Sequence, residues 1–552
     1  MGGFLSDLKP ETNEEVLKTP FGPIRGNIYK HGEKIVDGYL GIPYAKPPVG
    51  ELRFKKPEAA EAWTETRDCT KYGPIAPQNS FFGPIGPPRP PMDEGQCLSL
   101  NVFAPRWTSD EFKSGRPVMV FIHGGGYELS SSADYNDYSL TGTLPLKDVI
   151  VVTLNYRLGV LGFFTTGDDV CRGNMGLWDQ TLALKWVHDH IVHFGGDADN
   201  ITVFGQSAGG ASTDLLSLSP HSRDLFRKFI PMSGSAHCDF ALRTSKNQAT
   251  IFRELAVQNG YTGDDSESLL QWFKEQPQEF LVDVTKLKKS ISGFLTYTPN
   301  LDGDFFPKPL DELRKEASKK SMMTGICEYE GLILAFMDPA FTTADDSLKK
   351  QLAGLIGPDT HSNPEEARKK LYEIYVNGVD KSDEAAMKKK LTELVGDSFF
   401  DVGVLESAKN ATKHGNDVYL YSFEYCTPKS FGMFGTNFPF EAATHCTDLR
   451  YVFGEGVYSK FEPNEEDLKL LDHTGLLFTN FAKYGNPNGK DAIGWEKYTL
   501  DKPGRHFRIS IPTSEMREKF QNGRTQVWEE SDKESNKYQA IVYGKEQSQS
   551  KL

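Results

Sequence analysis

The sequence predicts an α/β fold in which a large, mostly parallel and twisted sheet is flanked by helices. Short apolar segments alternate with helical patterns along the 552-residue chain, and this alternation is typical of parallel sheets covered on both faces. Hydrophobic residues make up 38% of the chain and charged residues 25%, so a sizeable core can be buried. The chemistry of such sheets lies just outside the carboxyl ends of the strands, and functional residues are expected in the loops there.

Five strands and one helix carry this prediction. Apolar runs predict buried strands at residues 118–122, 149–154, 201–204, 229–232 and 418–425. Leu184, Val187, Ile191 and Phe194 recur at helical spacing and mark one face of a helix.

The chain is long enough for several average domains, but large α/β enzymes often form a single one. We interpret it as one domain over residues 18–535, with flexible tails at residues 1–17 and 536–552. Helical insertions are expected around residues 239–320 and 340–400.

Charge and composition disfavour several kinds of partner. The net charge is −14, whereas nucleic acids and anionic membrane surfaces attract clustered Lys and Arg. A membrane span needs about 18 apolar residues in a row, and the most apolar segment, residues 149–164, contains Asn155 and Arg157. The seven cysteines are widely spaced without a CxxC pair, so neither a zinc site nor a disulfide-dense scaffold is expected.

The clearest chemical motif is GQSAG at residues 205–209, which directly follows one predicted strand and precedes a helical pattern. Strand, tight turn and helix are the context of the G-x-S-x-G nucleophile elbow, a feature of the α/β-hydrolase fold. The turn strains the serine backbone, and larger side chains at positions 205 or 209 would clash with neighbouring backbone. A phosphate-binding loop would need Gly-Lys-Ser/Thr, which is absent. Ser207 is therefore the candidate nucleophile, and it needs a base beside it.

A second motif, HGGGY at residues 123–127, follows the predicted strand at residues 118–122. Consecutive glycines expose backbone N–H groups, which can stabilise the oxyanion of a tetrahedral intermediate. The order of the two motifs along the chain matches an α/β-hydrolase.

Sequence patterns alone do not assign the catalytic base and acid to single residues. In an α/β-hydrolase the acid and then the histidine follow the serine, which removes His123, His188, His190 and His193. Spacing does not choose cleanly among five of the later histidines: His361, His414, His445, His473 and His506. His445 is favoured because it lies in a long loop after a strand, whereas His473 falls in a helical pattern and His506 in a strand-like run. Glu328 and Glu330 are both candidates for the acid, since both follow a short apolar run.

Two long segments carry a resemblance to a known family: GIPYAKPP at residues 41–48 with LRF at 52–54, and residues 173–209, which end in the nucleophile motif. The chain resembles the type-B carboxylesterases, which include the cholinesterases and juvenile hormone esterases. The similarity runs from TPFG at residues 19–22 to about residue 498.

The resemblance implies a role for each site residue. The family's acid corresponds to Glu330 in GICEYEG, and its base to His445. Its oxyanion donors correspond to the N–H groups of Gly125, Gly126 and Ala208. The family hydrolyses carboxylic esters through an acyl-enzyme on the serine, and it requires no metal or cofactor.

Two departures from the cholinesterases point to neutral substrates. No tryptophan occurs between Trp63 and Trp107, where the resemblance would place the choline site, and Gln206 stands where cholinesterases carry Glu. A cationic substrate would lose both an aromatic face and a nearby carboxylate.

The resemblance also implies a disulfide between Cys69 and Cys97, although a reducing compartment would leave both as thiols. Gly95-Gln96 replaces the Glu-Asp that usually precedes the second cysteine. The family's salt bridge to Arg53 is therefore in doubt in this chain.

Two other functions share parts of this pattern. Inactive adhesion proteins of the neuroligin type usually lose the serine and carry a signal peptide and a membrane span, whereas this chain keeps Ser207 and lacks both targeting features. An acyltransferase would pass the acyl group from Ser207 to an alcohol instead of water, and product analysis with a competing alcohol would separate it from a hydrolase.

Both ends of the chain carry short targeting motifs. The start matches M-G-x-x-x-[ST], which makes Gly2 a candidate for lipidation, and the chain ends in Ser550-Lys551-Leu552, an address read by the peroxisomal import receptor. The acidic N-terminus lacks the basic start and apolar core of a secretory signal. We expect an intracellular protein of the peroxisome, the cytoplasm or both.

Overall fold

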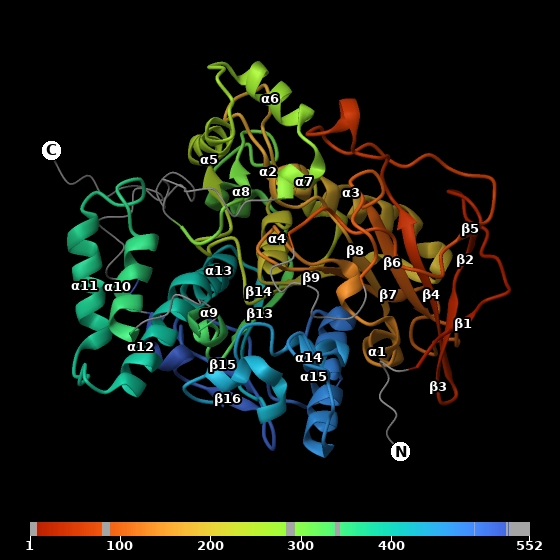
Figure 1. Cartoon of the computed structure of the whole chain (residues 1–552). Helices are drawn as coiled ribbons and strands as arrows, with labels where there is room; N and C mark the ends of the chain where they lie inside the picture. Colours follow the sequence, from red (N-terminus) through yellow and green to blue (C-terminus); the bar gives the residue numbers. More distant parts are fainter. Residues whose placement is uncertain are drawn as a thin grey trace.

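The computed structural model describes residues 8–79, 89–282, 293–336, 343–490, 492–525 and 528. Within these residues a central sheet of 12 strands runs in the order β1-β3-β4-β6-β8-β7-β9-β10-β13-β14-β15-β16. Its middle, from β8 to β15, is parallel, and both ends are antiparallel. Figure 1 shows this sheet crossing the molecule between helices. The predicted α/β fold is confirmed.

The strands of the central sheet have the following bounds: β1 (Glu11–Thr12), β3 (Asn27–His31), β4 (Lys34–Pro43), β6 (Ser99–Pro105), β7 (Arg116–Ile122), β8 (Ile150–Leu154), β9 (Gly196–Gln206), β10 (Lys228–Met232), β13 (Ser321–Cys327), β14 (Asp417–Phe423), β15 (His506–Ile509) and β16 (Glu515–Arg517). Two small parallel pairs lie outside it: β2 (Ile24–Arg25) with β5 (Arg67–Asp68), and β11 (Arg243–Thr244) with β12 (Asn300–Leu301).

The five predicted strands all form, as β7, β8, β9, β10 and β14. Every residue of β7, β8 and β10 is buried, as their apolar runs predict. β9 begins earlier than expected, at Gly196, because the polar residues before Ile201 continue the pairing with β7 past a register shift. A search for apolar runs cannot find such an extension.

The helices have the following bounds: α1 (Asp137–Thr141), α2 (Gly159–Phe163), α3 (Met175–His190), α4 (Ala208–Leu216), α5 (Ser245–Gln258), α6 (Ser266–Glu275), α7 (Gln278–Val282), α8 (Leu310–Glu316), α9 (Gly331–Phe336), α10 (Ala344–Leu355), α11 (Pro364–Val376), α12 (Glu384–Gly396), α13 (Val402–Lys413), α14 (Leu449–Phe453) and α15 (Glu465–Tyr484). A π-helical turn, Asp397–Asp401, joins α12 to α13. The predicted helix over residues 184–194 is α3, which ends in a 3₁₀ turn, Ile191–Phe194.

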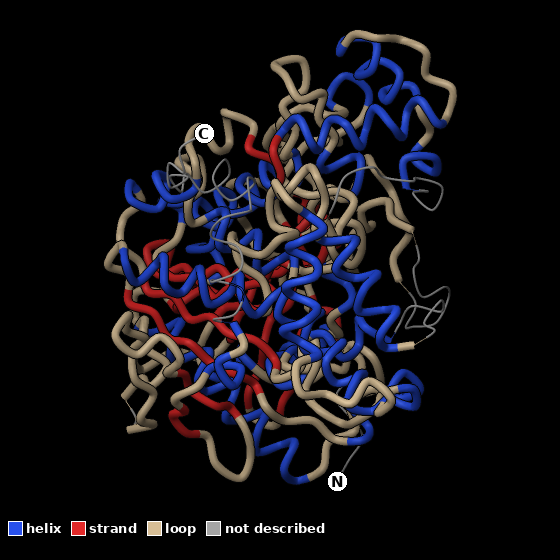
Figure 2. Tube along the Cα trace, turned by 90° about the vertical axis from the view of Figure 1, so that its left-hand side faces the viewer, coloured by secondary structure: helices blue, strands red, loops and turns tan. Residues whose placement is uncertain are grey.

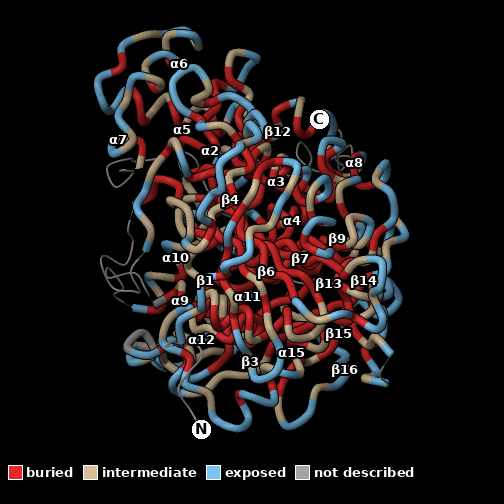
Figure 3. Tube along the Cα trace, turned by 90° about the vertical axis from the view of Figure 1, so that its right-hand side faces the viewer, coloured by how far each residue is buried: buried red, intermediate tan, exposed pale blue. Residues whose placement is uncertain are grey.

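Alternate residues of β7 divide the core into two layers. Val118 and Val120 pack in a cluster with residues of α3 and α4, whereas Met119 and Phe121 pack in a second cluster with residues of α15. Successive side chains of a strand point to opposite faces, so helices cover both faces of the sheet. Figures 2 and 3 show the strands gathered in the interior and buried along most of their length.

The expected helical insertions contain α5 to α8 and α10 to α12, and Figure 1 places these two groups at the top and the left of the sheet. No helix among the described residues is both long and apolar enough to cross a membrane. Gly2 and the Ser550-Lys551-Leu552 motif lie outside the described residues.

Candidate active site

Ser207 lies at the carboxyl end of β9, in the sharp turn that leads into α4. Its backbone has φ of 61° and ψ of −125°, a strained conformation for a residue with a side chain. A side chain on Gly205 would run into the backbone of Gly209, and one on Gly209 would run into the carbonyl oxygen of Ile122. The clash expected at both glycines is confirmed, and the turn presents the partly buried Ser207 at the edge of the sheet.

The glycines that follow β7 form a loop beside the nucleophile. A Cβ atom added to Gly124 would lie 3.0 Å from Cβ of Ser207. Gly125 and Gly126 have φ of 95° and 62°, a backbone that favours glycine. Within the described residues, the N–H groups of Gly125, Gly126 and Ala208 donate no hydrogen bond. They are therefore available to a negatively charged oxygen near Ser207.

His445 and Glu330 are joined by a short hydrogen bond. Nδ1 of His445 lies 2.6 Å from Oε2 of Glu330, which is fully buried in the turn after β13. The other carboxylate oxygen accepts hydrogen bonds of 2.6 Å from the Ser233 hydroxyl and 2.6 Å from the Cys327 N–H group. These contacts fix the carboxylate, and they leave the second ring nitrogen of His445 for another partner.

The surroundings of His445 favour its charged form. Burial of the ring opposes a charge, but the Cys446 side chain and the Glu330 carboxylate outweigh burial and raise the pKa of His445 above its ordinary value. An imidazolium that forms while His445 takes a proton is therefore stabilised by the carboxylate beside it.

The nucleophile and the base are close in the fold but not in direct hydrogen-bonding contact. Among the described residues no hydrogen bond joins the Ser207 hydroxyl to His445. The side chain beside the imidazole is that of Gln206, with its amide nitrogen 3.3 Å from Nε2. The ring of Phe400 stacks on the imidazole, with centroids 4.3 Å apart. Contacts between nucleophile and base often tighten only when substrate binds.

The structure separates the alternatives that sequence patterns left open. Glu328 lies beside Glu424, and burial raises its pKa, while only Glu330 of the two contacts His445. His473 lies within α15 and His506 within β15, as their patterns indicate. Of the two remaining histidines, His361 precedes α11 and His414 follows the last residue of α13.

Sequence patterns did not predict two residues of the site, Ser233 and Phe400. Ser233, which binds Glu330, directly follows β10, and the rule that chemistry collects at the carboxyl ends of parallel strands was a signal that pointed to it. Phe400 lies in the π-helical turn between α12 and α13. No local pattern distinguishes it from the core phenylalanines of that insertion.

The suggested disulfide is not formed. Cys69 and Cys97, the possible pair that the resemblance implies, are both free thiols and buried in this structure. Burial raises the pKa of Cys69 to about 12 and also raises the pKa of Cys97. Both thiols are therefore protonated and poorly reactive at neutral pH.

The doubt about Arg53 is also corrected. Arg53 forms a salt bridge with Glu94, and its Nε donates a 2.7 Å hydrogen bond to the same carboxylate. The acidic partner stands one position before Gly95-Gln96, the two residues that replace the usual pair. Arg53 also donates to the carbonyl oxygens of Lys274 and Gln276, which ties the first loop to the insertion that carries α6 and α7.

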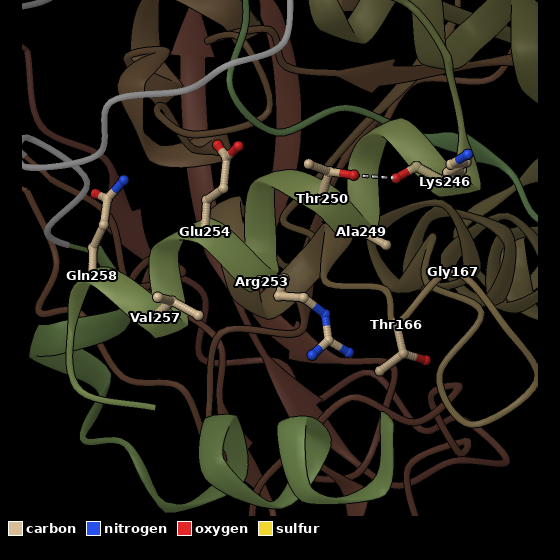
Figure 4. A pocket seen from close by; sticks show the side chains of 9 residues that line it. All are labelled: Thr166, Gly167, Lys246, Ala249, Thr250, Arg253, Glu254, Val257 and Gln258. Atoms are coloured by element: carbon tan, nitrogen blue, oxygen red, sulfur yellow. Dashed lines mark hydrogen bonds between the residues drawn. The ribbon is translucent and has the colours of Figure 1, made fainter. Parts of the chain in front are cut away.

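A surface cavity of about 580 Å³ lies elsewhere, between α5 and the turn at Thr166 and Gly167. Figure 4 shows Arg253 reaching from α5 toward Thr166, while Glu254 points to the opposite side. None of the candidate catalytic residues lines this cavity. It is therefore separate from the chemistry at the end of β9.

Comparisons with known proteins agree with this geometry. The sequence profile of the carboxylesterase family matches residues 13–528. The chain is 65% identical to a Caenorhabditis elegans protein named "Esterase cest-33", over 99% of this chain and 100% of that protein. It is 31% identical to the medium-chain fatty acyl-CoA hydrolase precursor of Anas platyrhynchos, over 92% and 91%. It is 32% identical to acetylcholinesterase-1 of Trittame loki, over 89% and 91%.

Proposed function

The chain belongs to the carboxylesterase family and is a carboxylic ester hydrolase, and from this premise we propose that it cleaves neutral esters through an acyl-enzyme on Ser207. The observation that carries the proposal is the buried pair of His445 and Glu330, 2.6 Å apart. It lies at the same sheet edge as a strained serine and a loop of free N–H groups.

In the first half of the reaction, the Ser207 oxygen attacks the ester carbonyl while Nε2 of His445 takes the hydroxyl proton. Glu330 holds the Nδ1–H tautomer and stabilises the imidazolium. The carbonyl oxygen becomes negatively charged and is bound by the N–H groups of Gly125, Gly126 and Ala208. The imidazolium then gives its proton to the departing alcohol, and the acyl group remains on Ser207.

In the second half, water takes the place of the alcohol. His445 removes a proton from the water, the resulting hydroxide attacks the acyl carbonyl, and the same N–H groups bind the second oxyanion. The proton returns to the Ser207 oxygen as the carboxylic acid leaves. Each of the two steps uses the base first as a proton acceptor and then as a donor.

The preference for neutral esters rests on the side chains around the nucleophile. Gln206 is uncharged and 2% exposed, so the position next to Ser207 offers no carboxylate to a cationic substrate. We expect kcat/KM for a neutral butyrate thioester to exceed that for butyrylthiocholine. Equal values for the two substrates would contradict this preference.

A panel of p-nitrophenyl esters of graded acyl length tests the catalytic proposal. Wild-type protein is expected to release p-nitrophenol in a burst followed by steady turnover, and Ser207→Ala is expected to abolish both phases. Mass spectrometry of the protein quenched during the burst is expected to show the acyl group on Ser207. An active Ser207→Ala variant, or acylation at another residue, would overturn the assignment.

A further inference from the structure

Three groups from distant parts of the chain enclose the imidazole of His445. Glu330 accepts the hydrogen bond from Nδ1. Phe400 stacks on the ring, with planes inclined by 28°. The amide nitrogen of Gln206 lies 3.3 Å from Nε2 and 3.5 Å from Nδ1. Only Glu330 belongs to the proposed triad, so the other two contacts need an explanation.

The two distances from Gln206 indicate where its amide lies. Nε2 and Nδ1 flank a single ring carbon, so an atom in the ring plane and nearly equidistant from both would overlap the hydrogen on that carbon. The amide nitrogen therefore lies over a face of the imidazole and not along the lone pair of Nε2. A stacked phenyl ring covers its own face, so Gln206 and Phe400 lie on opposite faces.

We propose that Gln206 and Phe400 are positioning residues that hold the His445 ring between them, and that the neutral amide of Gln206 sets the pH range in which this base works. The inference rests on the proposed role of His445 as the general base. Gln206 and Phe400, on the two faces, fix the tilt of the imidazole, and Glu330 fixes its Nδ1 edge. The in-plane lone pair of Nε2 stays open to the Ser207 proton.

Gln206 is held firmly enough to serve this purpose. It is the last residue of β9, its side chain is buried, and it shares the backbone of the strained elbow. A Cβ atom added to Gly124 would lie 3.2 Å from Oε1 of Gln206. The Gln206 amide therefore lies between the glycine loop and His445, and its side chain is buried away from solvent.

Phe400 is held by the π-helical turn of Asp397–Asp401. Such turns insert one extra residue into a helix and occur frequently at functional sites. Here the turn directs Phe400 to His445, while Phe399 stacks on Phe294 with centroids 4.0 Å apart. Arg524 anchors the turn through hydrogen bonds of 3.2 Å to Asp397.

The titratable groups near the base come from elements other than β9. The Glu330 carboxylate faces Nδ1, and the Cys446 thiol follows His445 in the chain. Burial and the Glu330 carboxylate raise the pKa of Asp448, at the start of α14, to about 7. Tyr458 donates a 2.8 Å hydrogen bond to the His445 carbonyl oxygen.

Asp401, in the π-helical turn, is a further acidic group in this neighbourhood, and burial followed by the charge of Asp397 raises its pKa. From the end of β9 and the turn that follows it, Gln206 and Ser207 contribute uncharged side chains. The substitution Gln206→Glu would therefore place a new negative charge next to the imidazole of His445.

The sign of the expected change follows from this arrangement. The carboxylate of Gln206→Glu would stabilise the imidazolium, and an opposite charge at this range raises a histidine pKa by about one unit or more. The base works unprotonated, so the acid limb of the kcat/KM profile is expected to move to higher pH by about that amount. Gln206→Met, which is uncharged and similar in shape, is expected to leave the limb in place and to lower kcat.

Phe400→Leu removes the phenyl ring that covers one face of the His445 imidazole, without adding a charge. We expect it to lower kcat by about tenfold, with KM nearly unchanged, because a loosened base is misaligned in the transition state. Phe399→Leu is the matched control, since it alters the same π-helical turn at a ring that stacks on Phe294 and not on the base. It is expected to keep the wild-type kcat.

The experiment measures kcat and KM for p-nitrophenyl butyrate across the acid and neutral range, on the full chain and these four variants. The pH dependence of phosphonylation of Ser207 by a neutral fluorophosphonate provides a second readout that does not depend on substrate binding. An acid limb that does not move in Gln206→Glu, or that moves equally in Gln206→Met, would overturn the role of Gln206. Equal losses in Phe399→Leu and Phe400→Leu would overturn the role of Phe400. An active Ser207→Ala variant would instead overturn the proposed function.

Discussion

The carboxyl edge of the parallel sheet and the π-helical turn of Asp397–Asp401 hold the candidate site in different ways. At the sheet edge the backbone itself is confined, because neither Gly205 nor Gly209 has room for a methyl group. The π-helical turn contributes one stacked side chain, Phe400, and is anchored by ion pairs to Arg524. One region fixes the reacting groups through backbone geometry, and the other supports them through side chains.

This difference predicts what each region does when it is altered. A change at the sheet edge moves or removes a group that reacts, so its effect appears in the chemical step. A change in the turn first alters stability, and it reaches the chemistry only through the contact between Phe400 and His445. Substitutions in the two regions can therefore be ordered by the size and the kind of their expected effects.

The largest effect is expected from Glu330→Gln. The amide keeps the shape of the side chain but can neither stabilise an imidazolium nor enforce the Nδ1–H tautomer of His445, and loss of this function lowers kcat by about 10⁴-fold in related triads. Steady-state kinetics with a p-nitrophenyl ester measures it, and the thermal midpoint checks the fold. Glu328→Gln, two residues earlier, is the matched control and is expected to retain activity. A reversed result would assign the acid to Glu328.

The sheet edge could be predicted from the sequence far better than the turn. Ser207 and the glycine loop follow apolar strands and have a local pattern that determines their backbone. Glu328 and Glu330 share one local pattern, so only the family resemblance or the fold separates them, because the choice depends on the contact with His445, 115 positions after Glu330. No sequence pattern marks Phe400, because its role depends on the His445 ring, which only tertiary packing brings to it.

The anchor of the turn is expected to give the largest loss of stability. Arg524→Met leaves Asp397 buried without its cation, and the loss of one partner of a buried pair costs about 3–5 kcal/mol. We expect a lower midpoint in chemical denaturation and a kcat reduced only by a few fold. Arg517→Met removes an exposed pair with Glu515 and is expected to cost less than about 1 kcal/mol. Equal losses in the two variants would contradict the anchoring role of Arg524.

Gly209→Ala tests the confinement at the sheet edge. Its methyl group would press on the carbonyl oxygens of Ile122 and His123, and overpacking of this kind costs about 1–3 kcal/mol. Because the elbow must shift to make room, we expect the burst of acylation to fall together with the thermal midpoint. Unchanged acylation in a destabilised variant would show that the elbow tolerates displacement, which would weaken the contrast with the turn.

The smallest effect is expected when a glycine is replaced by alanine in the helical insertion around residues 340–400. Gly354 lies in α10, near the end of the helix, and a Cβ atom added there meets no atom within 4 Å. Alanine loses less backbone entropy than glycine when a helix forms, so Gly354→Ala is expected to stabilise the protein by about 0.5–1 kcal/mol without altering kcat. Urea denaturation of both glycine variants beside wild type measures the two changes, which should have opposite signs. If Gly354→Ala destabilised the protein as much as Gly209→Ala, the insertion would be as tightly confined as the sheet edge, and the contrast between the two regions would fail.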